Sequence, residues 1–178
     1  VRLKVIGYYG DIALCDGASF NEAFPAHALE AGLLLIDRGA VARRLSYDTI
    51  LKGLKGEGQT LAIQAMLFPI TIEMTKGDAQ IARRHLDLFE SMGIVMREFG
   101  SDCFIIESLA AFYQQDRVEE LVSEVLSGMD KVSIKMKEIA ALASKHVERV
   151  ESDLHRQVEE LLQTSAPFLS PSGQATIA

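Results

Sequence analysis

The hydrophobic pattern of the chain changes period several times, and the order of these changes limits the folds that it can adopt. Strand-like segments come first, followed by a helix, a strand, a helix, a pair of strands and further helices. A fold built from regular βαβ units would alternate one strand with one helix, and this sequence does not follow that order. The order therefore predicts an α+β fold.

β-branched, aromatic and other apolar residues mark the first predicted strands. Residues 3–15 predict two short strands joined by a tight turn near Tyr9–Asp11. Residues 16–32 contain Pro, Gly, Asn and Asp, and they predict a long irregular connection. Residues 33–36, with the sequence LLLI, predict a strand that is covered on both faces, because neither face carries a polar residue.

Local signals and helical spacing of apolar residues predict the rest of the chain. Pro69 removes a backbone donor from the strand over residues 64–74, so that strand is expected at a sheet edge or with a bulge. Thr75 and Asp78 form a capping-box pattern at the start of the next helix. The remaining elements are predicted as helices over residues 38–55, 76–92, 118–129, 132–150 and 154–162, strands over 94–100 and 102–109, and a candidate strand at the end of the tail.

Charge, hydropathy and cysteine content exclude some functions. The formal net charge of the 178 residues is −7, and an acidic domain is a poor autonomous DNA binder because DNA affinity depends mostly on neutralised phosphates. No apolar run approaches the roughly 18 residues that cross a bilayer, so no membrane partner is expected. Cys15 and Cys103 are expected as buried free thiols in a reducing cytoplasm. The chain opens directly in strand-like sequence, as a piece of a longer protein would.

The residues alone give no strong catalytic signature. The four histidines lack H-x-x-x-H spacing, and the two cysteines do not form a C-x-x-C pair. The segment GLKGEGQT at residues 53–60 has its lysine before the loop and lacks the G-K-[ST] ending of a phosphate-binding loop. The sequence therefore contains no strong metal-binding or nucleophile motif.

The segment QAMLFP, Gln64–Pro69, combines a polar anchor with apolar side chains in an extended peptide. Such a peptide can lie in a hydrophobic groove of a partner protein. The same apolar side chains can equally be core residues of a strand. The pattern alone leaves both interpretations open.

Four segments, taken in order, resemble one family. They are LLLIDRGAVARRLSYD at 33–48, QAMLFPITIEM at 64–74, HLDLFESMGIVMREFGSDCFIIESL at 85–109 and PFLSPSGQATIA at 167–178. Together they resemble the C-terminal dimerisation domain of the MutL family of DNA mismatch repair proteins. Residues 17–32 depart from the family, because its members usually have a short hairpin there.

The resemblance implies two subdomains. A dimerisation subdomain over residues 1–74 and 136–178 would contain a mixed or antiparallel sheet flanked by helices, and a smaller external regulatory α/β subdomain would cover residues 75–135. The resemblance also implies a homodimer that holds together two N-terminal ATPase arms outside this chain. A mismatch-recognition protein and DNA would be partners of the full-length protein, and no cofactor is expected in this domain.

Family members with endonuclease activity bind a divalent metal through the pattern Asp-Gln-His-Ala, two residues, Glu, four residues, Glu. Asp37 matches the first acid, and Asp48 keeps an acid at the last position. Gly39 stands at the histidine position and Arg43 at the first glutamate position. A permanent cation at Arg43 would repel the metal. Asp37 is then expected to act as a helix N-cap.

The other ligand positions of the family's metal site are also substituted. The Cys of one segment falls on Ser144, and the Cys and His of the closing segment fall on Ser170 and Ser172. Hydroxyl groups thus replace the sulfur and imidazole ligands that zinc requires, so the resemblance predicts a non-catalytic domain without a metal. Two alternatives stay open: a weak Mn²⁺-dependent nicking endonuclease that uses Asp37 and Asp48, and an unrelated small-molecule-binding regulatory domain.

The resemblance also favours the docking interpretation of QAMLFP. In bacterial members of the family this position carries the motif that docks on the replicative sliding clamp, and Gln64, Leu67 and Pro69 match that motif directly. Met66 would add a further apolar contact. We therefore expect Gln64, Met66, Leu67 and Pro69 to bind the sliding clamp.

Overall fold

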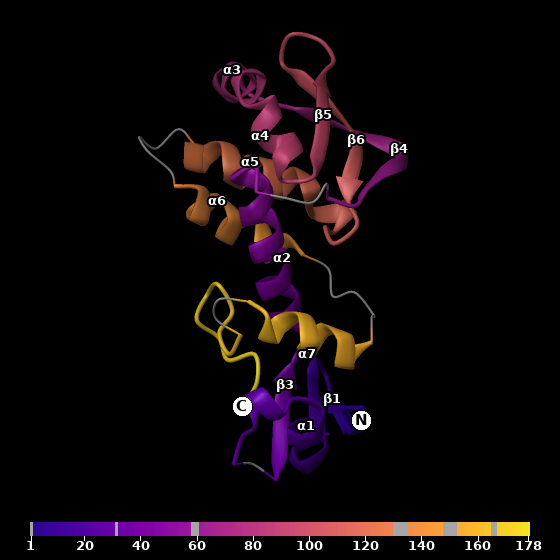
Figure 1. The fold of residues 1–178 in the computed structure, drawn as a ribbon. Helices are drawn as coiled ribbons and strands as arrows, with labels where there is room; N and C mark the ends of the chain where they lie inside the picture. Colours follow the sequence, from indigo (N-terminus) through magenta and orange to yellow (C-terminus); the bar gives the residue numbers. More distant parts are fainter. Residues whose placement is uncertain (1, 31, 58–60, 130–134, 148–152, 165–166) are drawn as a thin grey trace. The chain divides into compact units, whose positions relative to one another are not determined.

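The structure is a computed structural model that describes residues 2–30, 32–57, 61–129, 135–147, 153–164 and 167–178 (Figure 1). The chain divides into two compact units: the first is Val1–Ser46 with Arg149–Ala178, and the second is Tyr47–Glu148. Each unit contains a three-stranded antiparallel sheet and helices, which confirms the predicted α+β fold. Within the described residues, no helix combines the length and apolarity that crossing a bilayer requires.

The sheet of the first unit has three strands in sequence order: β1 (Val5–Tyr9), β2 (Ile12–Asp16) and β3 (Leu33–Asp37). A tight turn joins β1 to β2, and Gly10 adopts a φ of +57° there, which glycine reaches without steric penalty. Leu35 and Ala178 exchange backbone hydrogen bonds of 2.7 and 2.8 Å, so the end of the tail pairs with β3. The predicted strand pair at the start of the chain is thus confirmed, whereas the end of the tail forms an isolated bridge between Ile177 and Ile36 and no strand of its own.

The connection between β2 and β3 is largely helical, so the predicted irregular connection over residues 16–32 is wrong. It contains α1 (Gly17–Ala23) and a short 3-10 helix, η1 (Pro25–His27). The rings of Phe20 and Phe24 lie with their centroids 5.2 Å apart, and both side chains belong to the buried core of this unit. Apolar anchors spaced four residues apart favour a helix, and here this tertiary contact outweighs the turn-forming composition.

β3 is covered on one face only, so the prediction that both faces are covered is wrong. Leu34 and Ile36 are buried, whereas Leu33 and Leu35 are 52% and 42% exposed. The reason is the type of sheet. A continuous apolar run suits a parallel sheet, but β3 pairs antiparallel with β2, and antiparallel sheets often pack only one face on a core.

Two longer helices complete the core of the first unit: the first part of α2 (Arg38–Leu54), which continues into the second unit from Tyr47, and α7 (Leu154–Leu162). Their residues in this core are Val41, Leu154, Val158 and Leu161. Asp153 caps α7, because its Oδ1 accepts a hydrogen bond of 3.1 Å from the backbone N of His155. The carboxylate of Asp153 also forms an ion pair with Arg2 near the start of the chain. The two ends of the chain therefore contribute to the same unit.

The sheet of the second unit has the order β4–β6–β5, with β4 (Ile63–Glu73), β5 (Ile94–Glu98) and β6 (Cys103–Ala110). The helical elements of this unit after β4 are α3 (Lys76–Arg84), α4 (Leu86–Ser91), η2 (Gln115–Arg117), α5 (Val118–Met129), α6 (Met136–Ala143) and η3 (Ser144–His146). Thr75 Oγ1 accepts a hydrogen bond of 3.2 Å from the backbone N of Asp78, which confirms the predicted helix start.

Two predicted helices of the second unit are shorter than expected. The prediction over residues 76–92 corresponds to α3 and α4, separated at His85, whose φ of −124° is not helical. The prediction over residues 132–150 corresponds to α6 and η3, and its two ends lie outside the described residues. Apolar spacing continues through both interruptions, so it located the buried faces but not the breaks between helices.

The central strand β6 organises the core of the second unit. Its buried residues Phe104 and Ile106 pack with Phe89 of α4 in one hydrophobic cluster. Gly93 lies just before β5 with a φ of +87°, and a Cβ at this position would approach the Cβ of Ala110 to 2.6 Å. Only glycine therefore allows the chain to enter β5 so close to β6.

The two compact units do not have the bounds of the predicted subdomains, which were 1–74 with 136–178, and 75–135. β4 forms its ladder with β6, and α6 packs on α5, so β4 and α6 lie in the second unit. These pairings join segments that are distant in sequence, and a local pattern does not identify them. The assignment of the dimer interface to one of the two units is still a prediction.

Candidate functional sites

Asp37, the acid at the end of β3, is held by local hydrogen bonds. Its Oδ1 accepts a hydrogen bond of 2.9 Å from the backbone N of Ala40 in the first turn of α2. This contact confirms the predicted N-cap. The backbone N of Asp37 donates to the carbonyl of Thr176 over 2.9 Å. Asp37 therefore links the strand, the helix and the tail.

Arg43 joins α2 to a turn in the tail. Its Nη2 donates to Oε1 of Gln174 over 2.5 Å. The backbone N of Gln174 donates to Oγ of Ser170 over 3.0 Å, and its carbonyl accepts from the backbone N of Ser170 over 2.8 Å. Ser170 Oγ and Ser172 Oγ lie 3.0 Å apart. The structure thus brings Arg43, Ser170 and Ser172 into one neighbourhood of the first unit.

Gly39 lies between charged groups in this neighbourhood. A Cβ at this position would lie 3.3 Å from Nη1 of Arg43 and 3.3 Å from Oδ1 of Asp37. It would also lie 3.8 Å from Oδ2 of Asp11, a residue outside the predicted site. The predicted tight turn could have indicated Asp11. The strand after this turn pairs antiparallel with β3, and Ile12 pairs with Asp37, so the turn lies beside Asp37.

The other two predicted positions, Asp48 and Ser144, belong to the second unit, although Asp48 lies on α2, the helix that also carries Arg43. Ser144 is buried, and its Oγ donates to the carbonyl of Ala141 over 2.9 Å. Its hydroxyl is therefore used within its own helical segment. In the part of the chain that the structure describes, no group of three or more His, Cys, Asp and Glu side chains has the arrangement of metal ligands.

Both cysteines are free thiols, as the sequence predicts. Cys15 is buried in the sheet of the first unit, and burial raises the pKa of its thiol to about 11. A thiol with a raised pKa is little ionised at neutral pH and reacts slowly. Cys103 is only half-buried, so the predicted burial holds fully for Cys15 alone.

The segment QAMLFP interrupts the pairing of its own strand. β4 pairs with β6 up to Ala65 and again from Ile70, so residues 66–69 lie outside the regular ladder. This register shift confirms the bulge predicted from Pro69, and β4 is also an edge strand. A bulge turns the side chains that it carries away from the regular alternation of a strand.

The bulge exposes most of the predicted docking residues. Leu67 is 86% exposed, and Gln64 and Pro69 are also exposed. Met66 is half-buried and packs against the core of the second unit. Phe68 is 80% exposed and was not among the predicted residues. The bulge predicted at Pro69 could have indicated that Phe68 is exposed and belongs with the predicted docking residues.

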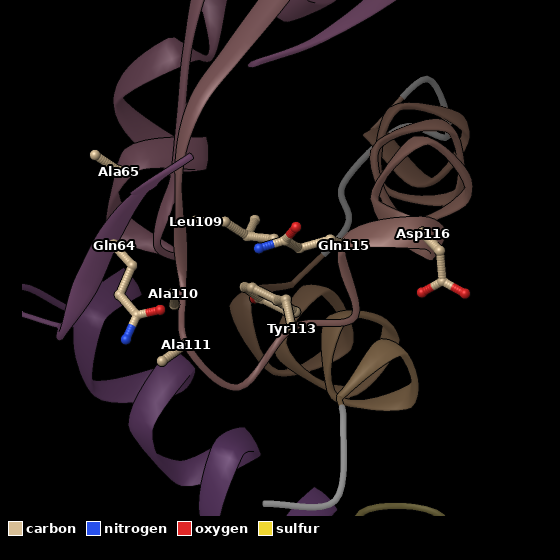
Figure 2. Close-up of a pocket in the computed structure, with 8 residues that line it drawn as sticks. All are labelled: Gln64, Ala65, Leu109, Ala110, Ala111, Tyr113, Gln115 and Asp116. Atoms are coloured by element: carbon tan, nitrogen blue, oxygen red, sulfur yellow. The ribbon is translucent and has the colours of Figure 1, made fainter. Parts of the chain in front are cut away.

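Gln64 also lines a pocket of about 450 Å³ in the second unit, shown in Figure 2. The pocket lies between the start of β4 and the segment that connects β6 to α5. Its other lining residues include Leu109, Ala110, Tyr113, Gln115 and Asp116. The hydroxyl of Tyr113 donates to the carbonyl of Met92 over 3.1 Å, and burial raises the pKa of this hydroxyl. The phenol is therefore fixed as a neutral wall of the pocket.

Comparison with known proteins identifies relatives of this chain. A DNA mismatch repair protein MutL from Bacillus pumilus (strain SAFR-032) is 28% identical over 161 residues, which cover 83% of this chain and 25% of that protein. The MutL of Halalkalibacterium halodurans is 29% identical over 161 residues, with 83% and 25% covered. The MutL of Caldanaerobacter subterraneus subsp. tengcongensis is 24% identical over 154 residues, with 80% and 25% covered. The chain thus spans about a quarter of the length of these relatives.

A sequence profile of one family matches residues 18–153, which is more than half of the chain. The profile is described as "MutL C terminal dimerisation domain". The matched region includes β3, α2 and the QAMLFP segment, which carry the resemblance in the sequence. The chain therefore belongs to the family of MutL C-terminal dimerisation domains.

Proposed function

We propose that this chain is the homodimerisation domain of a MutL-type DNA mismatch repair protein, and that two copies join through one face of the first sheet. The observation that carries the proposal is an apolar face opposite the core in a member of a dimerisation family. We call this surface the outer sheet face; its residues are Tyr9, Ile12, Leu14, Leu33 and Leu35.

The strand register defines the outer sheet face. Leu14 pairs with Leu35 across β2 and β3, and Tyr9 pairs with Ile12 across β1 and β2. Residues directly opposite each other in antiparallel strands point to the same side of the sheet. The alternate positions point to the core and are almost fully buried: Ala13, Cys15, Leu34 and Ile36. The sheet therefore has one apolar face in the core and a second, largely apolar face outside it, which also carries Asp16 opposite Leu33 and Asp37 opposite Ile12.

A second copy of the chain is the partner that suits the outer sheet face. Contiguous apolar surface on a soluble domain marks an interaction site. In a twofold dimer the same face of both copies meets itself, so an apolar sheet face is matched by an apolar sheet face. A joint that does not dissociate needs an interface of about 2,000 Å² or more, largely apolar. The first unit would then be the dimerisation subdomain and the second unit the external one.

Sedimentation of the purified chain at low micromolar concentration tests this dimer. We expect a dimer for the wild type and a monomer for Leu35→Glu, because dimerisation would bury the new carboxylate without a partner. Leu67→Glu is the matched control, since Leu67 is an exposed leucine of the second unit and its variant should stay dimeric. A monomeric wild type, or dissociation of both variants, would contradict the proposal.

In the full-length protein, this joint would hold two N-terminal ATPase arms together. A permanent joint at one end makes closure of the arms an intramolecular step with a high effective concentration. The closed arms would encircle DNA, and a mismatch-recognition protein would be a further partner. The proposed location of this repair protein is the cytoplasm.

We also infer that the endonuclease site of the family is degraded in this chain. A guanidinium from Arg43 and the hydroxyls of Ser170 and Ser172 occupy the neighbourhood in which the ligands would lie. Oδ1 of Asp37 already accepts the N-cap hydrogen bond. A fixed cation beside hydroxyl groups does not fit a divalent metal, so the proposed domain has no metal and no catalytic residue.

Plasmid nicking with Mn²⁺ tests this loss. We expect no nicking by the purified chain, whether wild type or Asp37→Asn. Asparagine keeps the N-cap, so the variant changes the charge of Asp37 and leaves α2 intact. Nicking by the wild type that disappears in Asp37→Asn would instead support the alternative, a weak metal-dependent endonuclease that uses Asp37 and Asp48.

The second part of the proposed function is docking of the QAMLFP segment on the replicative sliding clamp. Residues 66–69 leave the ladder, and the large apolar side chains of Leu67 and Phe68 extend into solvent. Burying such a side chain in a partner is worth about 1.5–3 kcal/mol. The exposed amide of Gln64 would supply the polar anchor, and Pro69 would limit the conformations of the free segment. Met66 would act mainly through the core of the second unit.

A pull-down with the sliding clamp tests this docking. We expect Leu67→Ala to lower affinity by about tenfold to a hundredfold, with Gln64→Ala weaker in effect. Leu33→Ala is the matched control, because it truncates another exposed leucine, on the outer sheet face, and should keep clamp binding. Thermal melting of each variant separates docking from folding. Unfolding of Leu67→Ala instead of a loss of affinity would support the core interpretation of the segment.

A further inference from the structure

We propose that the tail, residues 167–178, extends the dimer joint, so that Phe168 contacts the second copy and Arg43 positions the tail for this contact. The inference rests on the homodimer proposed above, because it adds a surface to the same joint. The partner is therefore a second copy of this chain. The proposal also gives a function to the guanidinium that stands where a metal ligand was expected.

The outer sheet face is too small to form this joint alone. Its three strands contain five residues each. With strands about 4.8 Å apart and a rise of about 3.4 Å per residue, they span a flat area of roughly 250 Å². A joint of about 2,000 Å² takes about 1,000 Å² of accessible surface from each copy, which is more than even twice that flat area. Further surface must therefore come from residues beside the sheet.

Backbone pairing places the tail at the edge of this sheet, beside β3 (Figure 1). The backbone N of Asp37 donates to the carbonyl of Thr176 over 2.9 Å, and the backbone N of Thr176 donates to the carbonyl of Phe168 over 3.1 Å. Residues directly opposite each other in antiparallel segments point to the same side. One row of side chains therefore crosses the sheet and the tail on the side of the outer sheet face: Tyr9, Ile12, Asp37, Thr176 and Phe168.

Two neighbouring apolar residues of the tail point to opposite sides. Phe168 belongs to the row on the outer side and is 37% exposed. Leu169 is 51% exposed, but it pairs with Ala175 and, as the next residue of an extended segment, it points to the other side. Tyr9 stands at the opposite end of the row. Aromatic side chains are enriched in protein interfaces, so Phe168 and Tyr9 suit the two ends of an apolar joint.

Hydrogen bonds hold the tail in the position that this row requires. Thr176 is fully buried, and its hydroxyl donates to the carbonyl of Pro167. Arg43 of α2 donates to Oε1 of Gln174 over 2.5 Å, and Gln174 is paired with Ser170 across the turn of the tail. Arg43 thus anchors the turn that leads into Thr176. It is a positioning residue, because it acts on the joint only through the tail.

The dissociation constant of the dimer tests the contribution of Phe168. It is measured by sedimentation of fluorescently labelled chain over a dilution series. We expect Phe168→Ala to raise this constant about thirtyfold, because each dimer loses two buried rings. Leu169→Ala is the matched control, since it truncates the neighbouring exposed side chain on the other side and should change the constant by less than about twofold.

A double-mutant cycle tests the role of Arg43. Arg43→Ala should raise the dissociation constant about fivefold in the wild-type chain. In the Phe168→Ala chain the same substitution should have no further effect, because the tail no longer contributes to the joint. Additive losses would show that Arg43 acts on the dimer by another route and would remove its positioning role.

A measurement on the wild type decides the question if Phe168→Ala fails to fold. A soluble nitroxide should relax the ring protons of Phe168 in the dilute monomer and spare them in the dimer, whereas the methyl groups of Leu169 should stay accessible in both. A ring that stays accessible in the dimer, or equal weakening by Phe168→Ala and Leu169→Ala, would overturn the proposal.

The outcome for Leu35→Glu separates this proposal from the dimer on which it rests. If Leu35→Glu dissociates the dimer and Phe168→Ala leaves its affinity unchanged, the outer sheet face forms the joint and the tail lies outside it. If Leu35→Glu stays dimeric, the outer sheet face is not the joint, and the proposed function fails together with its extension.

Discussion

The two sheets of the molecule have the same number of strands and the same antiparallel pairing, but they expose apolar side chains in different ways. In the first unit, outward and buried apolar residues alternate along β2 and β3, which pair without a register shift, and the outward residues contribute to the outer sheet face. In the second unit, Leu67 and Phe68 are exposed where β4 leaves its ladder. A flat face suits an identical flat face, whereas a protruding pair of side chains suits a pocket on a different protein.

The cores of the two units also differ in how far they cover their sheets. The second core joins the inner residues of its sheet to α3, α4, α5 and α6 and to the end of α2, through Ile50. The first core lies under one sheet face, and on the outer sheet face Leu33 and Leu35 are exposed while Ile12 and Leu14 are half-buried. Binding of a second copy stabilises the unit that carries the interface. We therefore expect association to stabilise the first unit and to leave the second unit unchanged.

Gly93→Ala carries the largest expected effect on folding and separates the units most clearly. The new methyl group would lie 2.6 Å from the Cβ of Ala110 at a backbone φ of +87°. Strain and overpacking together should destabilise the second unit by about 3 kcal/mol. Hydrogen exchange of the β6 amides measures this loss, and light scattering should still show a dimer.

Gly10→Ala is the matched control for this substitution. Gly10 also has a positive φ, of +57°, but a Cβ there would meet no atom within 4 Å. We expect a loss of about 1 kcal/mol, confined to the first unit. Dissociation of the dimer in Gly93→Ala would show that the second unit supports the joint, and the proposed contrast between the units would be wrong.

Dilution of the wild-type chain should produce the next largest effect. If folding of the first unit is coupled to dimerisation, each tenfold dilution lowers its stability by about 1.4 kcal/mol per dimer. Exchange of the β2 and β3 amides should therefore become faster on dilution, while exchange of the β6 amides stays constant. Equal acceleration in both sheets, or none in the first, would contradict the coupling.

Local signals in the sequence predicted much of this fold. The turn at Gly10, the helix start at Thr75 and the bulge at Pro69 each depend on a few neighbouring residues, and all three are present. Features that depend on distant partners were not predicted. Phe20 and Phe24 make α1 helical through contacts in the core, and the uncovered face of β3 depends on antiparallel pairing with β2.

The candidate sites show the same limit. Asp37 as an N-cap was predictable, because the contact lies within one helical turn. The hydrogen bond between Arg43 and Gln174 was not predictable, because it forms only when the tail returns beside β3. Asp11 was missed for the same reason. For the QAMLFP segment the pattern predicted a bulge or edge at Pro69 but left the surface and core interpretations of its apolar side chains open. Only the structure showed that Phe68 projects into solvent and that Met66 packs against the core.

Arg43→Ala is expected to have a smaller effect, confined to the first unit. It removes the hydrogen bond to Gln174 and should cost about 1 kcal/mol. The tail should pair less firmly with β3, so the backbone amides of Leu35 and Ala178 should exchange about fivefold faster. Arg156→Ala is the matched control, because the Nε of Arg156 bonds Glu160 within α7 and not the tail. Unchanged exchange in Arg43→Ala would show that other contacts hold the tail.

The smallest expected effect concerns one surface carboxylate in each unit. The hydrogen bond from Arg83 lowers the pKa of Glu98 in the second unit, and the hydrogen bond from Arg2 lowers the pKa of Asp153 in the first. A carboxyl group with a lowered folded-state pKa stabilises the folded state above its unfolded pKa, which is about 4.3 for Glu and about 3.9 for Asp. This contribution is lost as the pH falls through the folded-state pKa.

Glu98→Gln should therefore weaken the second unit slightly at about pH 7 and not at about pH 2, where the wild-type carboxyl group is already protonated. Asp153→Asn should act in the same way on the first unit, since asparagine still caps α7 and only the charge is lost. Both losses are small because the two ion pairs are exposed to solvent. Hydrogen exchange in each sheet as a function of pH measures them separately. If each variant changes the acid dependence of its own unit alone, the two units unfold independently; a change in the other unit would show that one cooperative core joins them.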